Sequence, residues 1–184
     1  MSSGSSRLTA QVDAADHVRG VSGGPVLVVY GDFQCPYTAQ AVRDIGRLLD
    51  RGAAFEVVFR HFPLREIHPN AEAAAETAEA AAEQGRFWEM HDLLFRNQLH
   101  LEPDDLRRFA ERLGLDLERF DRALADQTTK DRIEWDVTSG DQSGVDGTPG
   151  LFIDGGRYLG PRDPVSLAAA LGLPTPDRGF SPPT

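Results

Sequence analysis

The 184-residue sequence predicts an α/β fold made of a β-α-β half and a β-β-α half with an all-helical segment between them. Three observations predict it. Strand patterns at 25–30 and 54–61 enclose a helical pattern, and strand patterns return at 150–154 and 157–160 before a last helical pattern. No extended strand pattern interrupts residues 66–142.

The first half is predicted from short apolar runs. Residues 25–30 are rich in β-branched side chains and bounded by Gly and Pro, which is typical of a buried strand. Pro36 then favours the first position of a helix, and apolar residues at helical spacing continue it over 39–49. Residues 54–61 form the second predicted strand, so this half is a β-α-β unit.

The remaining elements follow in order. Helices are predicted to run from His68 to Gly85, over 86–95, from Glu102 onward, over 117–125 and over 130–140. The strands at 150–154 and 157–160 flank a Gly155–Gly156 hairpin turn, and Asp163 caps a last helix that ends at Leu171. The predicted organisation is a core of 17–65 and 143–172, an insertion of 66–142, and tails of 1–16 and 173–184.

The acidic charge is concentrated in the predicted insertion. The chain has 29 acidic and 19 basic residues, and a net charge of −10 argues against a nucleic-acid partner. Residues 66–142 contain 19 of the acidic and 9 of the basic side chains, so the rest of the chain is neutral. Two interpretations stay open: a solvated helical cap, or an acidic docking face for a basic partner.

The chain has one cysteine, Cys35, which excludes an intramolecular disulfide and a zinc site built from several thiolates. The polar N-terminal residues 1–7 lack the apolar region of a signal peptide, and no apolar run is long enough to span a membrane. We therefore expect a cytoplasmic protein without a membrane partner.

Cys35 occupies a position that favours chemistry. It follows a predicted strand and directly precedes a helix, where unpaired backbone N–H groups and the helix dipole favour the thiolate over the thiol. The alternative is a small buried apolar residue, as free cysteines often are. Thr148–Pro149 comes directly before the strand at 150–154, which makes a cis-proline plausible at the end of the same sheet.

Several motifs together resemble the DsbA-like branch of the thioredoxin superfamily over roughly residues 17–172. They are Val28-Val-Tyr-Gly-Asp-Phe-Gln-Cys-Pro-Tyr37, Phe59-Arg-His-Phe-Pro-Leu64, His68-Pro-Asn-Ala-Glu72, Gly85-Arg-Phe-Trp-Glu-Met-His91, Gly114-Leu-Asp116, Gly144-Val-Asp-Gly-Thr-Pro149 and Phe152-Ile-Asp-Gly155. The resemblance implies a thioredoxin fold with a helical insertion. It also implies that Cys35 is the nucleophile and that Pro149 is the cis-proline beside it.

Two departures from the family pattern shape the functional hypothesis. The family's redox motif is Cys-Pro-x-Cys, but Thr38 stands here in place of the second cysteine. Thr38 cannot resolve a mixed disulfide, so the resemblance implies a monothiol that needs an external thiol such as glutathione. Gly150 follows the proline where relatives often have threonine, which predicts a wider substrate groove.

The predicted site combines catalytic Cys35, Thr38 and Pro149 with substrate contacts from the residues around them, namely Pro36, Tyr37, Thr148 and Gly150. The Thr38 hydroxyl is expected to bond either the sulfur or the backbone. No cofactor is predicted beyond glutathione as a co-substrate, and the partner is a disulfide- or glutathione-bearing protein or a small thiol. Two other functions remain open: a glutathione-dependent isomerase or transferase, and a binding module without redox activity.

Two residues near the thiol each allow two interpretations. Asp32 acts as a base near the thiol or caps its loop, and Phe33 lines a substrate rim with Tyr37 or fills the core edge. Arg60 and Arg65 are expected to be surface or ion-paired residues. A metal site is not predicted, because no two of His61, His68 and His91 have the i, i+4 spacing of helical metal ligands.

Overall fold

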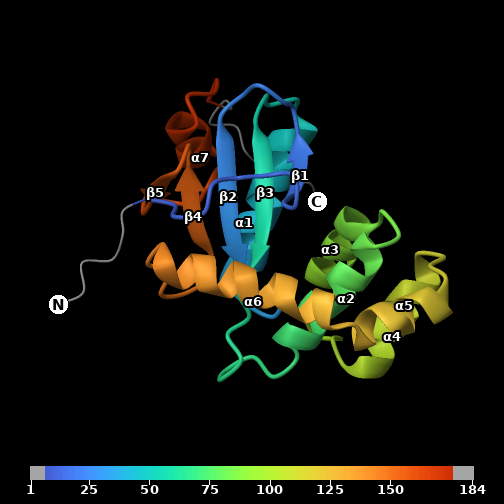
Figure 1. Ribbon diagram of the computed structural model, residues 1–184. Coiled ribbons are helices and arrows are strands. Elements are labelled where there is room, and N and C mark those ends of the chain that lie inside the picture. Colours follow the sequence, from blue (N-terminus) through green and yellow to red (C-terminus); the bar gives the residue numbers. More distant parts are fainter. Residues whose placement is uncertain (1–6, 176–184) are drawn as a thin grey trace.

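The computed structural model describes residues 7–175 and places five strands in one mixed sheet of order β1-β3-β2-β4-β5 (Figure 1). The strands are β1 (His17–Gly20), β2 (Val26–Gly31), β3 (Glu56–His61), β4 (Gly150–Ile153) and β5 (Gly156–Tyr158). β2 and β3 pair in parallel, and the other neighbouring strands pair antiparallel. The β-α-β and β-β-α halves meet where β2 pairs with β4.

The central strand β2 is apolar throughout because both of its faces are buried. Leu27 and Val29 face the main core, while Val28 and Tyr30 face a second, smaller core that also contains Phe152. Successive side chains of a strand point to opposite faces, so this alternation follows directly from the extended backbone. Burial on both sides explains why the strand reads as a continuous apolar run.

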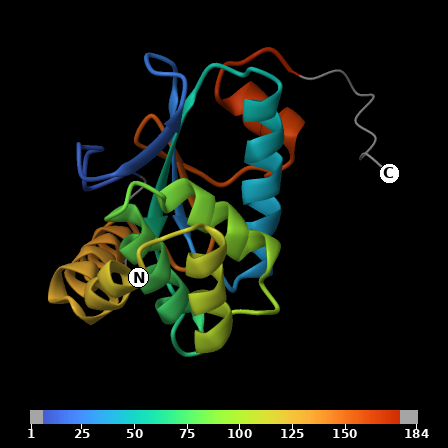
Figure 2. The ribbon, with the colours of Figure 1, turned by 90° about the vertical axis from the view of Figure 1, so that its right-hand side faces the viewer.

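Two helices cover one face of the sheet. They are α1 (Pro36–Asp50), which connects β2 to β3, and α7 (Pro164–Ala170), which follows β5. They pack side by side on the face that carries the main core (Figure 2). Both begin with proline at the start of the helix, and the Asp163 side chain accepts hydrogen bonds from the first turn of α7.

The insertion consists of the five helices between the two halves. In Figure 1, α2 to α5 lie at the lower right of the sheet and α6 runs below it. They are α2 (Ala71–Ala82), α3 (Phe87–Arg96), α4 (Pro103–Arg112), α5 (Leu117–Ala125) and α6 (Gln127–Gln142). The alanine-rich α2 lies at their centre, and its small buried side chains let α3, α5 and α6 approach it closely. α6 also packs against β3, so the insertion is joined to the sheet. The α/β thioredoxin fold with a helical insertion is thereby confirmed.

The prediction of an N-terminal tail over 1–16 is wrong for residues 7–16. This segment crosses the sheet on the face opposite α1, and Leu8 is buried in the second core (Figure 1). Asp16 forms a fully buried ion pair with Arg60, which also donates to the backbone carbonyls of this segment. These hydrogen bonds from the buried Arg60 guanidinium hold the segment against the sheet. Residues 1–6 and 176–184 of the predicted tails lie outside the described residues.

None of the described helices is both long enough and apolar enough to span a membrane.

Candidate functional site

Cys35 lies at the N-terminal end of α1, as the sequence predicts. It is the N-cap residue, with an extended backbone (φ −74°, ψ 121°), and Pro36 begins the helix. Its side chain makes no capping hydrogen bond to the helix, so the sulfur stays available for other contacts. The residue is only 3% exposed. The thiol therefore sits at a positive helix end and has little contact with solvent.

The sulfur contacts the loop before β4. Cys35 Sγ donates a hydrogen bond of 3.4 Å to the carbonyl oxygen of Thr148, and the Thr148–Pro149 peptide bond is cis. The pairing of Tyr30 with Gly150 brings the end of β2 and the start of β4 to the same edge of the sheet. The thiol is the donor in this hydrogen bond, and the Thr148 carbonyl oxygen is the acceptor.

The buried Thr38 lies in the first turn of α1, and its hydroxyl oxygen lies 3.5 Å from the backbone N–H of Asp32, which donates to it. Among the hydrogen bonds of residues 7–175, that hydroxyl has no bond to the Cys35 sulfur. Of the two predicted roles, the structure therefore shows the backbone contact.

Asp32 organises the loop that carries the cysteine. Its Oδ1 accepts from the backbone N–H groups of Gln34 (2.7 Å) and Cys35 (3.2 Å). Its Oδ2 accepts from the backbone N–H of Leu64 (2.8 Å) and contacts His68 Nδ1 (2.7 Å). Both oxygens are thus occupied in a residue that is 1% exposed. This supports loop capping over a role as a free base.

The two aromatic residues near the thiol have different environments. Tyr37 is 69% exposed and, with the 82% exposed Leu159, lines a hollow of about 540 Å³ beside the start of α1. Phe33 is instead buried in the main core against Phe59 and Phe95. The rim interpretation therefore fits Tyr37, and the core interpretation fits Phe33.

The expectation that Gly150 widens a substrate groove is wrong. A Cβ atom at this position would lie 2.9 Å from Val145 Cγ1 and 3.0 Å from Val145 Cγ2. Val145 belongs to the second core, so a side chain at 150 would push into that core. Glycine is present because Val145 packs directly onto the strand backbone.

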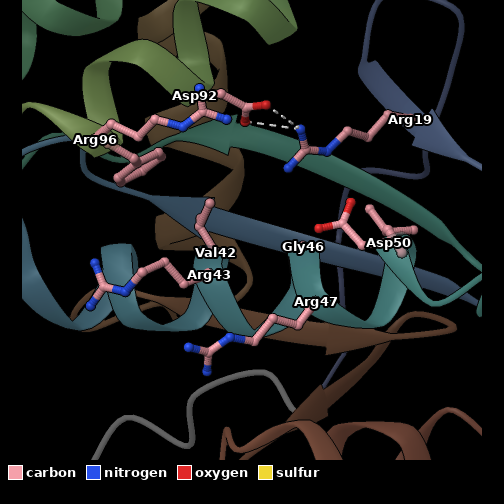
Figure 3. Close-up of a pocket in the computed structure, with 10 residues that line it drawn as sticks. Arg19, Val42, Arg43, Gly46, Arg47, Asp50, Asp92 and Arg96 are labelled. Atoms are coloured by element: carbon pink, nitrogen blue, oxygen red, sulfur yellow. Dashed lines mark hydrogen bonds and ion pairs between the residues drawn. The ribbon is translucent and has the colours of Figure 1, made fainter. Parts of the chain in front are cut away.

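A second hollow, of about 680 Å³, lies between α1 and α3 and contains none of the predicted site residues (Figure 3). Four arginines line it, but their charges do not converge on one point. Arg19 pairs with Asp92, while Arg43 and Arg47 extend away from that pair. This hollow therefore does not form a single anion site.

Three histidines, which are His61, His68 and His91, each contact a carboxylate. His68 contacts Asp32, His91 contacts Asp92, and His61 contacts Glu79. Burial raises the pKa of Glu79, but hydrogen bonds from His17 and His61 outweigh it and hold that pKa below its usual range. Sequence spacing missed this cluster because His17, His61 and Glu79 come from three separate elements.

The predicted arginine environments are confirmed. Arg60 is fully buried and forms a two-point hydrogen bond with Asp16. Arg65 is ion-paired with Glu72 and Glu134 nearer the surface. Neither arginine is placed to clamp a substrate at Cys35.

A cysteine at the N-terminus of α1, next to a cis-proline in a mixed sheet with a helical insertion, defines a thioredoxin-fold protein of the DsbA-like class. The profile of the DSBA-like thioredoxin domain matches residues 26–172. The chain belongs to this family.

Solved structures agree on the fold. A thioredoxin-like oxidoreductase from Silicibacter pomeroyi DSS-3 superposes with a TM-score of 0.78 and 24% identity, over 87% of this chain and 92% of that one. The thiol-disulfide exchange protein α-DsbA2 from Wolbachia pipientis gives 0.77 and 19%, over 87% of each chain. Oxidised BdbD from Bacillus subtilis gives 0.76 and 17%, over 92% of this chain and 95% of that one.

The curated relatives are longer proteins. The chain is 52% identical over 157 residues to Na(+)/H(+) antiporter NhaA 3 from Salinispora tropica and 50% identical over 157 residues to NhaA 1 from Salinispora arenicola. Each match covers 85% of this chain and 24% of the relative. The chain thus spans about a quarter of the length of these relatives.

Proposed function

We propose that the chain catalyses thiol–disulfide exchange as a monothiol, with Cys35 as the nucleophile. The observation that carries this proposal is the placement of the Cys35 sulfur at the start of α1, against the Thr148 carbonyl, with Thr38 at the position of a resolving cysteine. The sulfur lies at the positive end of the α1 dipole, and Thr38 has no sulfur with which to close an internal disulfide.

The reaction has two balanced steps. The Cys35 thiolate attacks one sulfur of a glutathione-bearing disulfide, forms a new S–S bond with it, and expels the other sulfur as a thiolate. An external thiol such as glutathione then attacks the mixed disulfide and expels Cys35 as a thiolate. The substrate disulfide is reduced to a thiol, and one new disulfide joins the external thiol to the sulfur that Cys35 took from the substrate. The proton of the external thiol passes to the thiolate released from the substrate, so no further oxidant is needed.

The surrounding residues suit an extended substrate. Pro36 and Pro149 have no backbone N–H, so neither residue donates a backbone hydrogen bond to the sulfur. The exposed Tyr37 offers an apolar contact at the hollow beside α1. A buried Thr148 hydroxyl lacks a hydrogen-bond partner among the described residues. Because Cys35 is 3% exposed, a narrow peptide carrying the disulfide is favoured over a folded surface.

The decisive test is turnover of a peptide–glutathione mixed disulfide with glutathione as the second thiol. We expect turnover by the wild type, loss of turnover in Cys35→Ser, and retention in the matched control Thr38→Ser. Rapid alkylation of Cys35 near about pH 6 would accompany it. A thiol that stays inert until about pH 9 would favour the binding module, and conjugation of glutathione to an electrophile would favour the transferase. A supply of reduced glutathione fits the cytoplasm, which cell fractionation would test.

The curated relatives favour a second candidate, in which the chain acts with a Na⁺/H⁺ antiporter. A segment similar to this chain makes up 24% of two relatives that carry the antiporter name. Antiport by vesicles that contain a host antiporter, measured with the wild type and with Cys35→Ser, would test it. A rate that changes only with the wild-type chain supports the candidate, and equal rates with both chains contradict it.

A further inference from the structure

A cluster of two histidines and one glutamate joins the sheet to the insertion. His17 Nε2 lies 2.6 Å from Glu79 Oε1, and His61 Nε2 lies 2.7 Å from the same oxygen. The three atoms all lie within 4.8 Å of one another. The cluster arises because His17 pairs with Phe59 across β1 and β3, and His61, two residues further on, points to the same face. Glu79 reaches it from α2.

We propose that His17, His61 and Glu79 bind a divalent transition metal of the zinc type. Imidazole nitrogens with one carboxylate oxygen are donors that Zn²⁺ accepts and that Mg²⁺ and Ca²⁺ disfavour. Zinc ligands at about 2.1 Å in tetrahedral geometry stand about 3.4 Å apart. The two histidine–glutamate distances therefore need to open by less than about 1 Å to admit the ion.

The histidine rings are already held in place. His17 is stacked on Phe87, with ring centroids 3.4 Å apart and planes 7° from parallel. His61 packs among the rings of Phe33 and Phe59, and its Nδ1 is buried with no hydrogen-bond partner among the described residues. Among the described residues, the His61 ring therefore makes its polar contact with Glu79 alone. The aromatic packing keeps both histidine rings oriented toward the Glu79 carboxylate.

Solvent can reach the cluster from one side. The side chains of His17 and Glu79 are 16% and 10% exposed to solvent, and that of His61 is 1% exposed. Three protein ligands leave a fourth position, which a water molecule would fill from the side of His17. An ion can therefore enter without unfolding the insertion.

The proposed ion has a structural role that does not depend on the thiol chemistry. Its ligands come from β1, β3 and α2, so it ties the core to the insertion. None of the hydrogen bonds of residues 7–175 links these three side chains to Cys35.

The test is a calorimetric titration of the chelator-treated full chain with ZnCl₂. We expect one zinc per chain, a rise in Tm with zinc, and no binding of Mg²⁺. Bound Co²⁺ should show the visible absorption of a four- or five-coordinate nitrogen–oxygen site. His17→Gln and Glu79→Gln should each weaken zinc binding by at least about tenfold. The matched control is His100→Gln at an exposed histidine, which should keep the wild-type affinity.

Two further controls keep the result interpretable. Cys35→Ser must retain the zinc site, because zinc bound at the thiol would be lost in that variant. His17 is on an edge strand and partly exposed, so His17→Gln decides the question even where Glu79→Gln fails to fold. The proposal is overturned by a wild type that does not bind zinc one to one, or by an affinity that His17→Gln leaves unchanged.

Discussion

The Sγ atom of Cys35 lies 3.4 Å from the carbonyl oxygen of Thr148, a residue 113 positions further along the chain. The antiparallel register of β2 and β4 brings the two together, because Tyr30 pairs with Gly150 and both flanking loops leave the same edge of the sheet. The contact covers the sulfur while it is protonated. Nucleophilic attack by Cys35 therefore requires loss of the thiol proton. The strand register fixes the loop whose carbonyl accepts that proton's hydrogen bond.

Thr38→Cys should convert the monothiol site into a dithiol site. Residue 38 is buried in the first turn of α1, three residues after Cys35, and its hydroxyl makes only a 3.5 Å contact with Asp32 that a thiol can forgo. We expect the variant to form a 35–38 disulfide in oxidised glutathione and to oxidise a reduced peptide at least about ten times faster than the wild type. Thiol counting and a peptide oxidation assay measure both effects.

The matched control for this variant is Thr38→Ser, which keeps a hydroxyl and cannot form a disulfide. It should behave as the wild type in both assays. Two free thiols persisting in Thr38→Cys under oxidised glutathione would contradict the placement of residues 35 and 38 derived above.

Gly150→Ala should destabilise the fold without opening or closing the thiol site. The added methyl group would lie 2.9 Å from Val145 in the second core, and such overpacking costs about 1–3 kcal/mol in the free energy of unfolding. Urea denaturation measures the loss, and a Val145→Ala partner substitution should recover part of it. The alkylation rate of Cys35 should stay within about twofold. A large change in that rate with unchanged stability would restore the groove interpretation.

The fold could be predicted from the sequence where an element is determined by its own neighbouring residues. The continuous apolar run of β2, and the proline at the first position of α1, are visible in the residues themselves. β1 was not predicted, because four residues that alternate between half-buried and exposed form a strand only through pairing with β3. The direction of a Cβ at Gly150 likewise depends on Val145, which a linear pattern does not place.

In the candidate site, too, single residues could be predicted from the sequence but the contacts between them could not. Cys35 and Pro149 could be chosen from their neighbours in the sequence, whereas the contact of the Cys35 sulfur with the Thr148 carbonyl is a property of strand register. Asp16 was assigned to a tail because its partner, Arg60, is 44 residues away. His17 offered no sequence spacing to the other ligands, since the cluster is formed by a strand pair and a helix from the insertion.

Arg60→Met should be among the most damaging single substitutions in the core. Arg60 and Asp16 are both fully buried at their side chains and share two hydrogen bonds of 2.8 Å. Removing Arg60 leaves the buried Asp16 with the longer 3.2 Å contact to Arg132 as its ion pair, and breaking a buried pair in this way costs up to about 3–5 kcal/mol. Arg65→Met is the control, because its ion pairs are partly exposed and should be worth less than about 1 kcal/mol. Equal losses for the two variants in urea denaturation would contradict this expectation.

His91 should make the folded state sensitive to mild acid. Burial lowers the pKa of His91 to about 4 from 6.5, in spite of the hydrogen bond to Asp92. The unfolded chain therefore takes up a proton near pH 6.5, while the folded chain does so only near pH 4. Between these values the unfolded state binds more protons, so stability falls as pH falls, by up to about 3 kcal/mol.

The measurement is the free energy of unfolding in urea at several pH values between 7 and 4 in wild type, His91→Asn and His100→Asn. His91→Asn is expected to start from a lower stability at pH 7, because the buried ring packs against Phe59 and Phe95. The slope is the informative quantity: it should flatten in His91→Asn and persist in His100→Asn, whose histidine is exposed. The buried carboxylates Asp16 and Glu79 have lowered pKa values and lose their contribution only at lower pH. Burial raises the pKa of Asp136, but this group is present in all three proteins, so the difference in slope between the wild type and His91→Asn isolates the histidine. A wild-type slope retained in full by His91→Asn would show that another group takes up the proton.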